Sequence, residues 1–224
     1  MNTQLFHSKK VLRTVLFLMI IGIGMGKSFA QNNPGLPGGH GLEGNQDANG
    51  GSPAMTTQTL AMDEGWNWVS LYLECDANLL TALQAGIAQN NVTGVIKDMN
   101  TSDILQNGSW SGNLSLTNES MVMVYLKNPT TVTLSASLAN PANHTITLEP
   151  GWNWICYPLD HSISVSEALS GITPHNNDLI KNMSGSASFT NNTWQGSLKS
   201  LVPGEGYMYY NNGSAMTLTY PTSK

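Results

Sequence analysis

The chain has 224 residues, of which 40% are hydrophobic and only 10% are charged, and its formal net charge is −5 at pH 7. Nine Lys and Arg residues stand against fourteen Asp and Glu residues, and Arg13 is the only arginine. Nucleic acids and phosphate-rich ligands are bound by clusters of arginine and lysine, so this composition argues against both as partners. It argues against an anionic membrane surface for the same reason.

The first thirty residues have the pattern of an export signal. A positive segment with Lys9, Lys10 and Arg13 precedes an apolar run, and a small-x-small cleavage site ends at Ala30. The uninterrupted apolar stretch, 15–25, is shorter than the ~20 residues of a membrane span, which favours cleavage over anchoring. Cleavage would leave five lysines against fourteen acids, a formal charge of −9. We therefore expect a periplasmic, cell-surface or secreted protein without an integral membrane segment.

Residues 31–57 are rich in Gly, Pro and Asn and form a predicted linker. They hold too few apolar side chains to offset the entropy of ordering, so a disordered tether is expected. His40 stands alone among glycines, where a solvated side chain is favoured over a metal ligand.

The rest of the chain repeats itself. Four sequence landmarks occur twice in the same order, separated each time by 84 to 86 residues. Such self-similarity predicts one module carried twice, over 58–138 and 144–221, with a short joint at 140–143. The landmarks are GWNW at 65–68 and 151–154, VIKDM and LIKNM at 95–99 and 179–183, WSGNL and WQGSL at 110–114 and 194–198, and ESMVMV and EGYMYY at 119–124 and 205–210.

Each module is predicted to be α+β but mainly β: a small antiparallel sheet or open barrel with one short helix. In chain order, an alternating strand is followed by a glycine turn and a longer strand on which Val69, Leu71 and Leu73 share one face. Trp66 and Trp68 therefore fall on the opposite face. The opening strands are expected at 58–61 and 145–148, and the longer strands at 66–73 and 152–159.

A short helix follows in each module. The helical spacing of Leu79, Leu80, Leu83 and Ile87 predicts the first, and Ser164 or Ser166 is the expected N-cap in the second. Strands at 92–99 and 178–183 come next. Turns at 107–108 and 191–192 then predict hairpins leading into the WSGNL and WQGSL landmarks. The last strands, 121–126 with 131–136 and 206–210 with 215–220, are also expected to form hairpins, closed at 128–129 and 212–213.

The motifs at 148–155, 194–198 and 201–207 read Leu-x-Pro-Gly-Trp-Asn-Trp-Ile, Trp-x-Gly-Ser-Leu and Leu-x-Pro-Gly-x-Gly-Tyr. This pattern resembles a tandem repeat domain of large exported surface proteins of Bacteroidetes-type bacteria. The resemblance covers about 58–221 and implies an accessory or adhesion-like role, with no catalytic residues to transfer. The first module departs from it, because residues 118–121 stand where the Pro-Gly-x-Gly-Tyr turn is expected.

No enzyme motif is present: the sequence has no nucleophile elbow, zinc-protease helix or phosphate-binding glycine loop. Asp160 with His161, and His175 with Asp178, are conceivable acid/base pairs, but no converging partners accompany them. We therefore expect a protein that is not an enzyme and that has no cofactor and no metal ion.

The two cysteines leave two alternatives open. Cys75 and Cys156 occupy non-equivalent positions of the repeat. After export they are able to form one disulfide, or to remain free and buried on their strands.

Two functions compete for the duplicated tryptophans. In the first, the rings fill the core of a non-catalytic surface or interaction module of the adhesion type. In the second, a Trp lies flat on the surface of a carbohydrate-binding module, where the ring stacks on a sugar and neighbouring amides and hydroxyls bind its hydroxyl groups. The partner is accordingly a surface protein or a glycan. The candidate ligand-binding residues are Trp194, Tyr207, Tyr209, Tyr210, Asn192 and Asn211.

Overall fold

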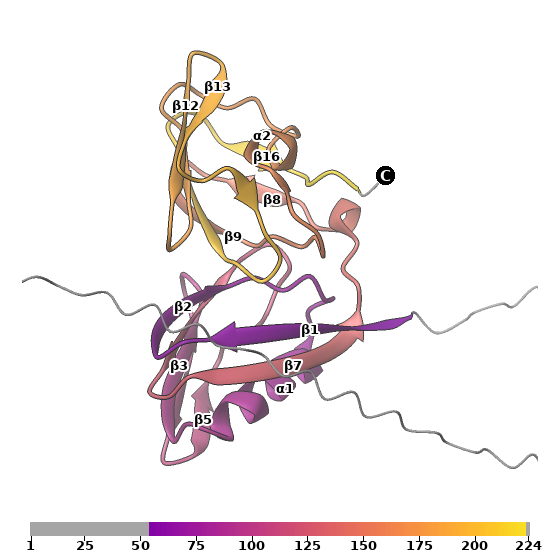
Figure 1. Ribbon diagram of the computed structural model, residues 1–224, viewed down its shortest axis with the longest axis vertical. Helices are drawn as coiled ribbons and strands as arrows, with labels where there is room; N and C mark the ends of the chain where they lie inside the picture. The colour runs from indigo at the N-terminus through magenta and orange to yellow at the C-terminus, as the bar shows by residue number, and fades with distance from the viewer. Residues whose placement is uncertain (1–53, 223–224) are drawn as a thin grey trace, which may run out of the picture. The chain divides into compact units, whose positions relative to one another are not determined.

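The computed structural model describes residues 54–222, and its fold is predominantly β with antiparallel sheets (Figure 1). The predicted export signal, 1–30, and most of the predicted linker, 31–57, lie outside the described residues. Two short helices accompany the strands. The sheets are open, and each half of the described chain has its own five-stranded sheet.

In the first half, the five strands are ordered β2–β6–β3–β4–β5, while β1 and β7 form a separate two-stranded ladder. Helix α1 lies against β7 and buries Leu79, Leu83 and Ile87, whereas Leu80, also predicted for the apolar face, is only partly buried. Asp76 caps this helix by accepting a hydrogen bond from the Leu79 amide. The elements are β1 (Met55–Met62), β2 (Gly65–Val69), α1 (Ala77–Ala88), β3 (Thr93–Lys97), β4 (Ser102–Gln106), β5 (Ser109–Gly112), β6 (Val122–Leu126) and β7 (Thr130–Ser137).

In the second half, the five strands are ordered β9–β15–β11–β12–β13, and β8 pairs with β16. Helix α2 has four residues, and its N-cap is Ser164, one of the two predicted caps. The elements are the 3-10 turn η1 (Pro141–Asn143), β8 (Ile146–Leu148), β9 (Gly151–Ile155), β10 (Ile163–Ser164), α2 (Val165–Ala168), β11 (Leu179–Lys181), β12 (Ser186–Thr190), β13 (Thr193–Gly196), β14 (Ser200–Leu201), β15 (Tyr207–Asn211) and β16 (Met216–Leu218).

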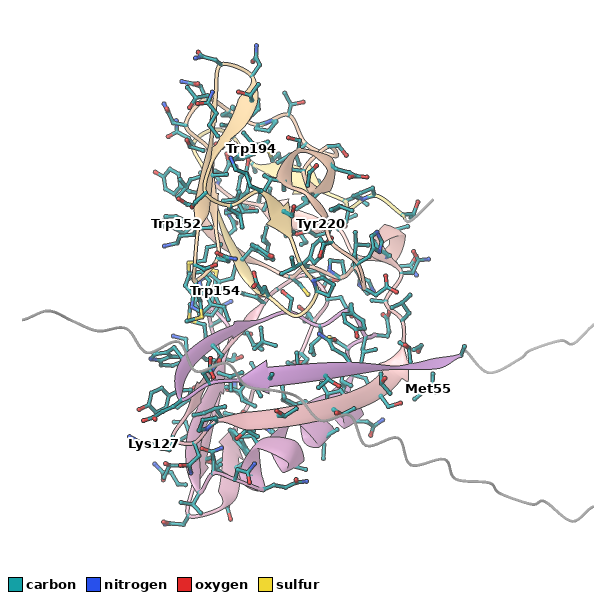
Figure 2. The ribbon with its side chains drawn as sticks, in the orientation of Figure 1. Met55, Lys127, Trp152, Trp154, Trp194 and Tyr220 are labelled. Atoms are coloured by element: carbon teal, nitrogen blue, oxygen red, sulfur yellow. The ribbon has the colours of Figure 1, made fainter. Side chains whose placement is uncertain are left out.

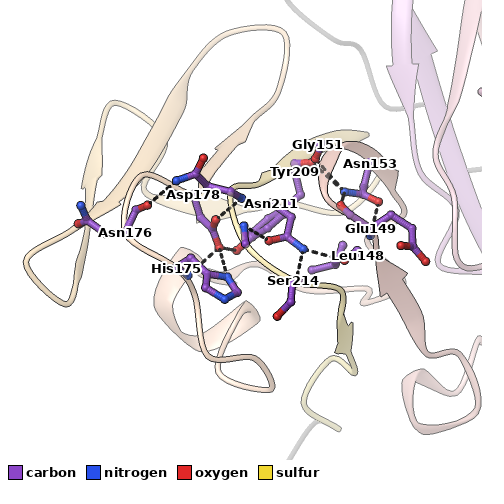
Figure 3. Close-up of polar contacts among 12 residues, drawn as sticks. Leu148, Glu149, Gly151, Asn153, His175, Asn176, Asp178, Tyr209, Asn211 and Ser214 are labelled. Carbon is purple, nitrogen blue, oxygen red and sulfur yellow. Dashed lines mark hydrogen bonds and ion pairs between the residues drawn. The ribbon is translucent and has the colours of Figure 1, made fainter.

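The repeated GWNW landmark has the same local structure in both halves. Gly65 and Gly151 have φ of 94° and 95°, a region that glycine enters without strain. Asn67 then clasps the preceding turn: its Oδ1 accepts from the Asp63 amide at 2.9 Å and its Nδ2 donates to the Asp63 carbonyl at 2.9 Å. Asn153 makes the same two bonds to Glu149, at 2.9 and 2.7 Å (Figure 3). The glycine and the asparagine therefore fix the turn, and the tryptophans are left to project from the sheet.

The predicted hairpins over 107–108 and 191–192 are confirmed. β4 pairs with β5, and β12 pairs with β13. Asn107 and Gly108 have φ of 51° and 79°, and Asn191 and Asn192 have φ of 52° and 59°. Two successive residues with positive φ match the twist of the flanking strands, which explains why Asn and Gly occur there.

The hairpins predicted for the last two strands of each half are wrong. In the first half, β6 pairs with β2 and β3, whereas β7 pairs with β1. In the second half, β15 pairs with β9 and β11, whereas β16 pairs with β8. The Asn91 side chain holds the chain where it turns, because its Oδ1 accepts from the amides of Lys127 (3.0 Å) and Asn128 (2.8 Å). The Nδ2 of Asn91 also donates to the hydroxyl of Thr130, at 2.8 Å. The strand that leaves this turn joins the β1–β7 ladder.

Two boundaries also differ from the sequence prediction. β1 begins at Met55 rather than 58, because residues 55–57 pair with 135–137 of β7 and so belong to a ladder instead of the linker. The long strands expected at 66–73 and 152–159 end at Val69 and Ile155. Beyond Val69, the chain is held by an isolated bridge between Leu73 and Leu138.

Each half has its own hydrophobic core between its five-stranded sheet and its helix. The first core is built from Leu, Val, Ile and Met side chains. The second core contains four fully buried tyrosines. They are Tyr157, Tyr207, Tyr209 and Tyr220.

Candidate binding surface

The structure disperses the ligand-binding residues predicted from the sequence. Tyr207, Tyr209 and Asn211 alternate along β15 on its core side, and they are 0%, 0% and 1% exposed. They are therefore unavailable to a ligand, and their assignment to a binding site is wrong. Tyr210 lies on the opposite side of the same strand and is half-buried.

Polar contacts show what two of these buried residues do instead (Figure 3). The Tyr209 hydroxyl donates to Oδ2 of Asp178 at 2.6 Å. The Asn211 Nδ2 donates to the carbonyls of Leu148 and Ser214, both at 2.8 Å. Burial and the Asp178 carboxylate raise the pKa of Tyr209 well above its usual value, so the phenol stays protonated. These side chains satisfy each other inside the fold.

Trp194 and Asn192 line one hollow, but the Trp194 ring packs against the core and does not lie on a flat patch. The Trp194 ring packs between Phe189 and Tyr209, with ring centroids 5.3 and 6.1 Å apart. Asn192 is exposed in the tight turn before β13. Both residues border a hollow of about 270 Å³ beside α2, lined by Ser166, Leu169, Ser170, Ile172, Pro174, Phe189, Asn192, Thr193 and Trp194.

The most exposed tryptophans lie instead on the outer face of each five-stranded sheet, the face turned away from its core. Trp66 is 44% exposed and Trp152 is 42% exposed. Each is directly opposite a tyrosine of the neighbouring strand, Tyr125 or Tyr210, and the ring centroids are 5.3 and 5.2 Å apart. The expectation that these tryptophans fill the core is therefore wrong. Figure 2 shows Trp152 and Trp154 on one side of their sheet and the buried Tyr220 on the other.

Trp68 and Trp154 connect the two halves, which belong to one compact unit of the chain. Each of these tryptophans lies under a lysine of the other half. The Lys181 Nζ lies 4.5 Å from the ring centroid of Trp152 and 5.7 Å from that of Trp68. Reciprocally, the Lys97 Nζ lies 5.4 Å from the ring centroid of Trp154. Each lysine thus reaches a tryptophan of the other half, at distances typical of cation–π contacts.

We call this surface the aromatic face. It comprises the outward-pointing aromatic side chains of both sheets and the lysines that lie over them. Its members are Trp66, Trp68, Tyr125, Trp152, Trp154 and Tyr210, with Lys97, Lys127 and Lys181.

Backbone contacts hold the two sheets together beside the aromatic face. The Ser70 amide donates to the Gly204 carbonyl at 3.1 Å, and the Gly206 amide donates to the Trp68 carbonyl at 3.0 Å. In the opposite direction, the Cys156 amide donates to the Glu119 carbonyl at 3.2 Å. The end of each GWNW strand is thus bonded to a loop of the other half.

The aromatic face gathers most of the positive charge of the described chain. Within residues 54–222 the cationic residues are Lys97, Lys127, Lys181 and Lys199, and the first three lie over aromatic rings. Every ion pair found in this part of the chain involves a histidine, so none of these lysines is paired with a carboxylate. Their charge remains available to a ligand.

Hollows border the aromatic face beside Tyr125 and beside Trp68. The first, of about 210 Å³, lies in the first half beside Tyr125 and Lys127, with Ile104 (40% exposed) on its wall. The second, of about 140 Å³, lies where the two halves meet, beside Trp68. The residues around the second hollow are Trp68, Asn182, Met183, Ser184, Glu205 and Gly206.

The conceivable acid/base pairs have local roles. Asp178 is fully buried, and its Oδ1 accepts a hydrogen bond from the Asn212 amide at 2.7 Å. Asn91 holds the corresponding turn of the first half in the same way, by accepting from a backbone amide. The Asp178 Oδ2 accepts from the His175 amide at 2.9 Å and from Tyr209. Asp160 and His161 form an exposed neighbouring pair at 2.9 Å. Among the described residues, no group of three or more His, Cys, Asp and Glu side chains is arranged to hold a metal ion.

Both thiols are free. Cys156 is buried where the halves meet, and its Sγ donates to the Leu71 carbonyl at 3.4 Å. Burial raises the pKa of the Cys156 thiol to about 11, and burial also raises that of Cys75, so both are protonated at neutral pH. A protonated thiol is a poor nucleophile. The surroundings of Cys75 and Cys156 therefore do not activate either thiol for catalysis.

The sequence did contain a signal for the aromatic face. Strand alternation placed Trp66 and Trp68 opposite the apolar side chains of Val69 and Leu71, which are buried. A strand with one face in the core exposes the other face unless a second layer covers it. Applied consistently, that alternation would have selected Trp66 and Trp152 rather than Trp194.

Between residues 54 and 222, no helix has the length and apolar character needed to cross a membrane. Comparison of the chain with protein-family models, with curated proteins and with solved structures gives no match.

Proposed function

We propose that this protein is an exported, non-catalytic surface module of the adhesion type, which binds its partner through the aromatic face. The observation that carries the proposal is the exposure of Trp66 and Trp152, which are 44% and 42% accessible and occupy corresponding positions in the two halves. Large exposed aromatic groups are unfavourable in water and typically mark interaction sites.

We further propose that the two halves are tandem homologous modules. Three features support this: the corresponding order of strands in the two sheets, the GWNW turn with its asparagine clasp, and the Trp–Tyr pair. Two copies of one module bring two copies of one binding element. A partner with repeated features, such as a polymer, gains from engaging both.

A carbohydrate ligand is the second candidate, and one observation favours it. In the second half, Ser186 and Ser188 pair with Lys181 and Leu179 and so share their outer face, and Gln195 follows on the next strand. Hydroxyl and amide groups therefore lie beside the Trp152–Tyr210 pair. A sugar ring stacked on Trp152 requires such donors and acceptors for its hydroxyl groups.

Binding assays with defined probes test the proposal. Mature protein is incubated with immobilised polysaccharides, collagen and fibronectin, and compared with a Trp66→Ala/Trp152→Ala variant. We expect the variant to lose binding to whichever probe the wild type retains, while its circular dichroism stays unchanged because both rings are partly in solvent.

The matched control removes two exposed apolar side chains away from the aromatic face. Met55 and Leu138 are 67% and 47% exposed, and Met55→Ala/Leu138→Ala should bind as the wild type does. Binding that survives loss of both tryptophans, or that is lost equally in the control, contradicts the proposal.

A further inference from the structure

We propose that the aromatic face binds an acidic polysaccharide, a polymer of hexuronic acid units. This inference rests on the proposed function and names its ligand. The aromatic rings supply flat apolar surfaces for the C–H faces of sugar rings, and the lysines supply positive charge for the carboxylates.

The first step of the argument is the position of Lys181. Its Nζ lies over the Trp152 ring, 4.5 Å from the ring centroid. A pyranose that stacks on this ring takes the place of the ammonium group, and the flexible lysine then lies at the edge of the sugar. A carboxylate at C5 of the sugar projects from that edge, so stacking and ion pairing become possible at the same time.

The second step is the distribution of charge. The mature chain is strongly acidic, yet three of the four lysines between residues 54 and 222 lie on the aromatic face and none forms an ion pair. A neutral sugar would gain little from this concentration of cations. An anionic polymer gains attraction at every lysine, and the acidic remainder of the surface disfavours its binding elsewhere.

The third step concerns the type of anion. Arginine is favoured for phosphate groups because its guanidinium group forms two parallel hydrogen bonds with them, and residues 54–222 contain no arginine. Spaced lysines act as single point charges, which suits a polymer with one carboxylate on each sugar.

One carboxylate of the protein limits where the ligand's acid groups lie. Glu205 borders the hollow beside Trp68, and its Oε2 accepts from Asn182 Nδ2 at 2.6 Å and from the Tyr207 hydroxyl at 3.2 Å. Like charges repel, so we expect the sugar carboxylate on the side of Lys181 that faces Trp152, away from Glu205.

Polygalacturonate and its fully methyl-esterified form are the matched probes, because they share a backbone and differ in charge. We expect the wild-type protein to bind the acidic form about tenfold more tightly by calorimetry, and this preference to weaken as salt is raised. Lys181→Gln should lower affinity for the acidic form roughly fivefold, as loss of one partly exposed ion pair does, and leave affinity for the ester unchanged. Lys199→Gln, which changes the one lysine of residues 54–222 that lies outside the aromatic face, should alter neither affinity.

The outcomes separate the two proposals. Equal binding of both polymers overturns the acidic ligand and leaves the adhesion-type function standing. An equal loss of both affinities in Lys181→Gln overturns it too, because it would show that this lysine only supports the rings. Thermal denaturation of each variant monitors that structural role. Failure of the protein to bind any probe of the earlier panel counts against the proposed function itself.

Discussion

The two halves of the chain build corresponding sheets but cover the inner faces of those sheets in different ways. The first half uses the 12-residue α1, whose Leu79, Leu83 and Ile87 enter an aliphatic core. The second half has only the 4-residue α2, which contributes Val165 and Ala168. The shared features lie in the turns and on the outer face. The comparison teaches that the framework of turns and strands does not depend on one particular core.

Tyrosines occupy the space that the short helix leaves. Tyr157 packs against Tyr207 and Tyr220 with ring centroids 6.2 and 5.6 Å apart, in edge-to-face arrangements. A buried phenol without a hydrogen-bond partner costs stability, and Tyr157 has a partner in the His161 carbonyl at 2.7 Å. A tyrosine core therefore requires polar groups near it, which an aliphatic core does not.

Among the variants that compare the two halves, Leu83→Ala is expected to change the free energy of unfolding most. Leu83 is fully buried in the first core, and its truncation removes several methyl groups and leaves a cavity. We expect a loss of about 3 kcal/mol in the free energy of unfolding, measured by urea denaturation. A loss below about 1 kcal/mol would show that α1 supports the first core no more than α2 supports the second.

The second prediction tests the hydrogen bonds of the tyrosine core. Tyr209→Phe leaves the buried Asp178 Oδ2 without its 2.6 Å donor, so we expect a cost of about 2 kcal/mol in stability. Tyr220→Phe is the matched control. Within the described part of the chain its buried hydroxyl has no partner, and its removal should be neutral or slightly stabilising. Equal costs for the two variants would contradict this account.

The third prediction concerns what the halves share. Asn67→Ala and Asn153→Ala each remove one clasp of a GWNW turn, and each should cost about 1 kcal/mol. The two values should agree within about 0.5 kcal/mol, because the bonds that are lost are the same in both halves. Chemical denaturation of the single variants measures the difference, and a clear inequality would mean that the two turns are not equivalent.

The smallest expected effect is a pH dependence at the joint between the halves. His144 follows η1, and its ring nitrogens lie 3.0 Å from Glu119 Oε1 and 2.9 Å from Glu74 Oε1. Burial alone lowers the pKa of His144, but the hydrogen bonds and charges of the two glutamates outweigh burial and raise the pKa above 6.5.

Because the pKa of His144 is higher in the folded state, its contribution to stability is fully present below the unfolded pKa. That contribution is lost as the pH rises from about 6.5 through the folded pKa. Thermal unfolding of the wild type should therefore show a modest fall in Tm over this window. The fall should be absent from His144→Gln, and an identical pH profile in the two proteins would contradict the assignment.

The sequence was sufficient for features that short-range chemistry determines. The Asn-Gly and Asn-Asn turns, the presence of the helix α1 (Ala77–Ala88) and the sequence repeat could all be read from residue type and spacing. The pairing of β7 with β1 could not, because it depends on the side chain of Asn91, which is distant in sequence from the turn it holds.

The candidate site was harder to predict for a related reason. The strand Tyr207–Asn211 carries large side chains on both faces, so alternation alone does not tell which face enters the core. Its counterpart Val122–Leu126 is clearer, since valines and leucine alternate there with Met123 and Tyr125. The landmark alignment of 119–124 with 205–210 places Met208 and Tyr210 against the buried Val122 and Val124, and so selects the wrong face. The strand pairing shows instead that Tyr210 corresponds to Tyr125, because each lies opposite the first tryptophan of its GWNW landmark. The two strands are therefore displaced by one residue from the sequence alignment.

The reciprocal backbone contacts between the halves have a further consequence, for aggregation. β2 and β9 are edge strands of their sheets, and an exposed edge is a template for pairing with other chains. Residues 204–206 occupy the end of one edge and Glu119 the end of the other, so each half blocks part of its neighbour's open edge. The presence of both halves in one polypeptide supplies the protection that a single half would have to obtain by pairing with another molecule.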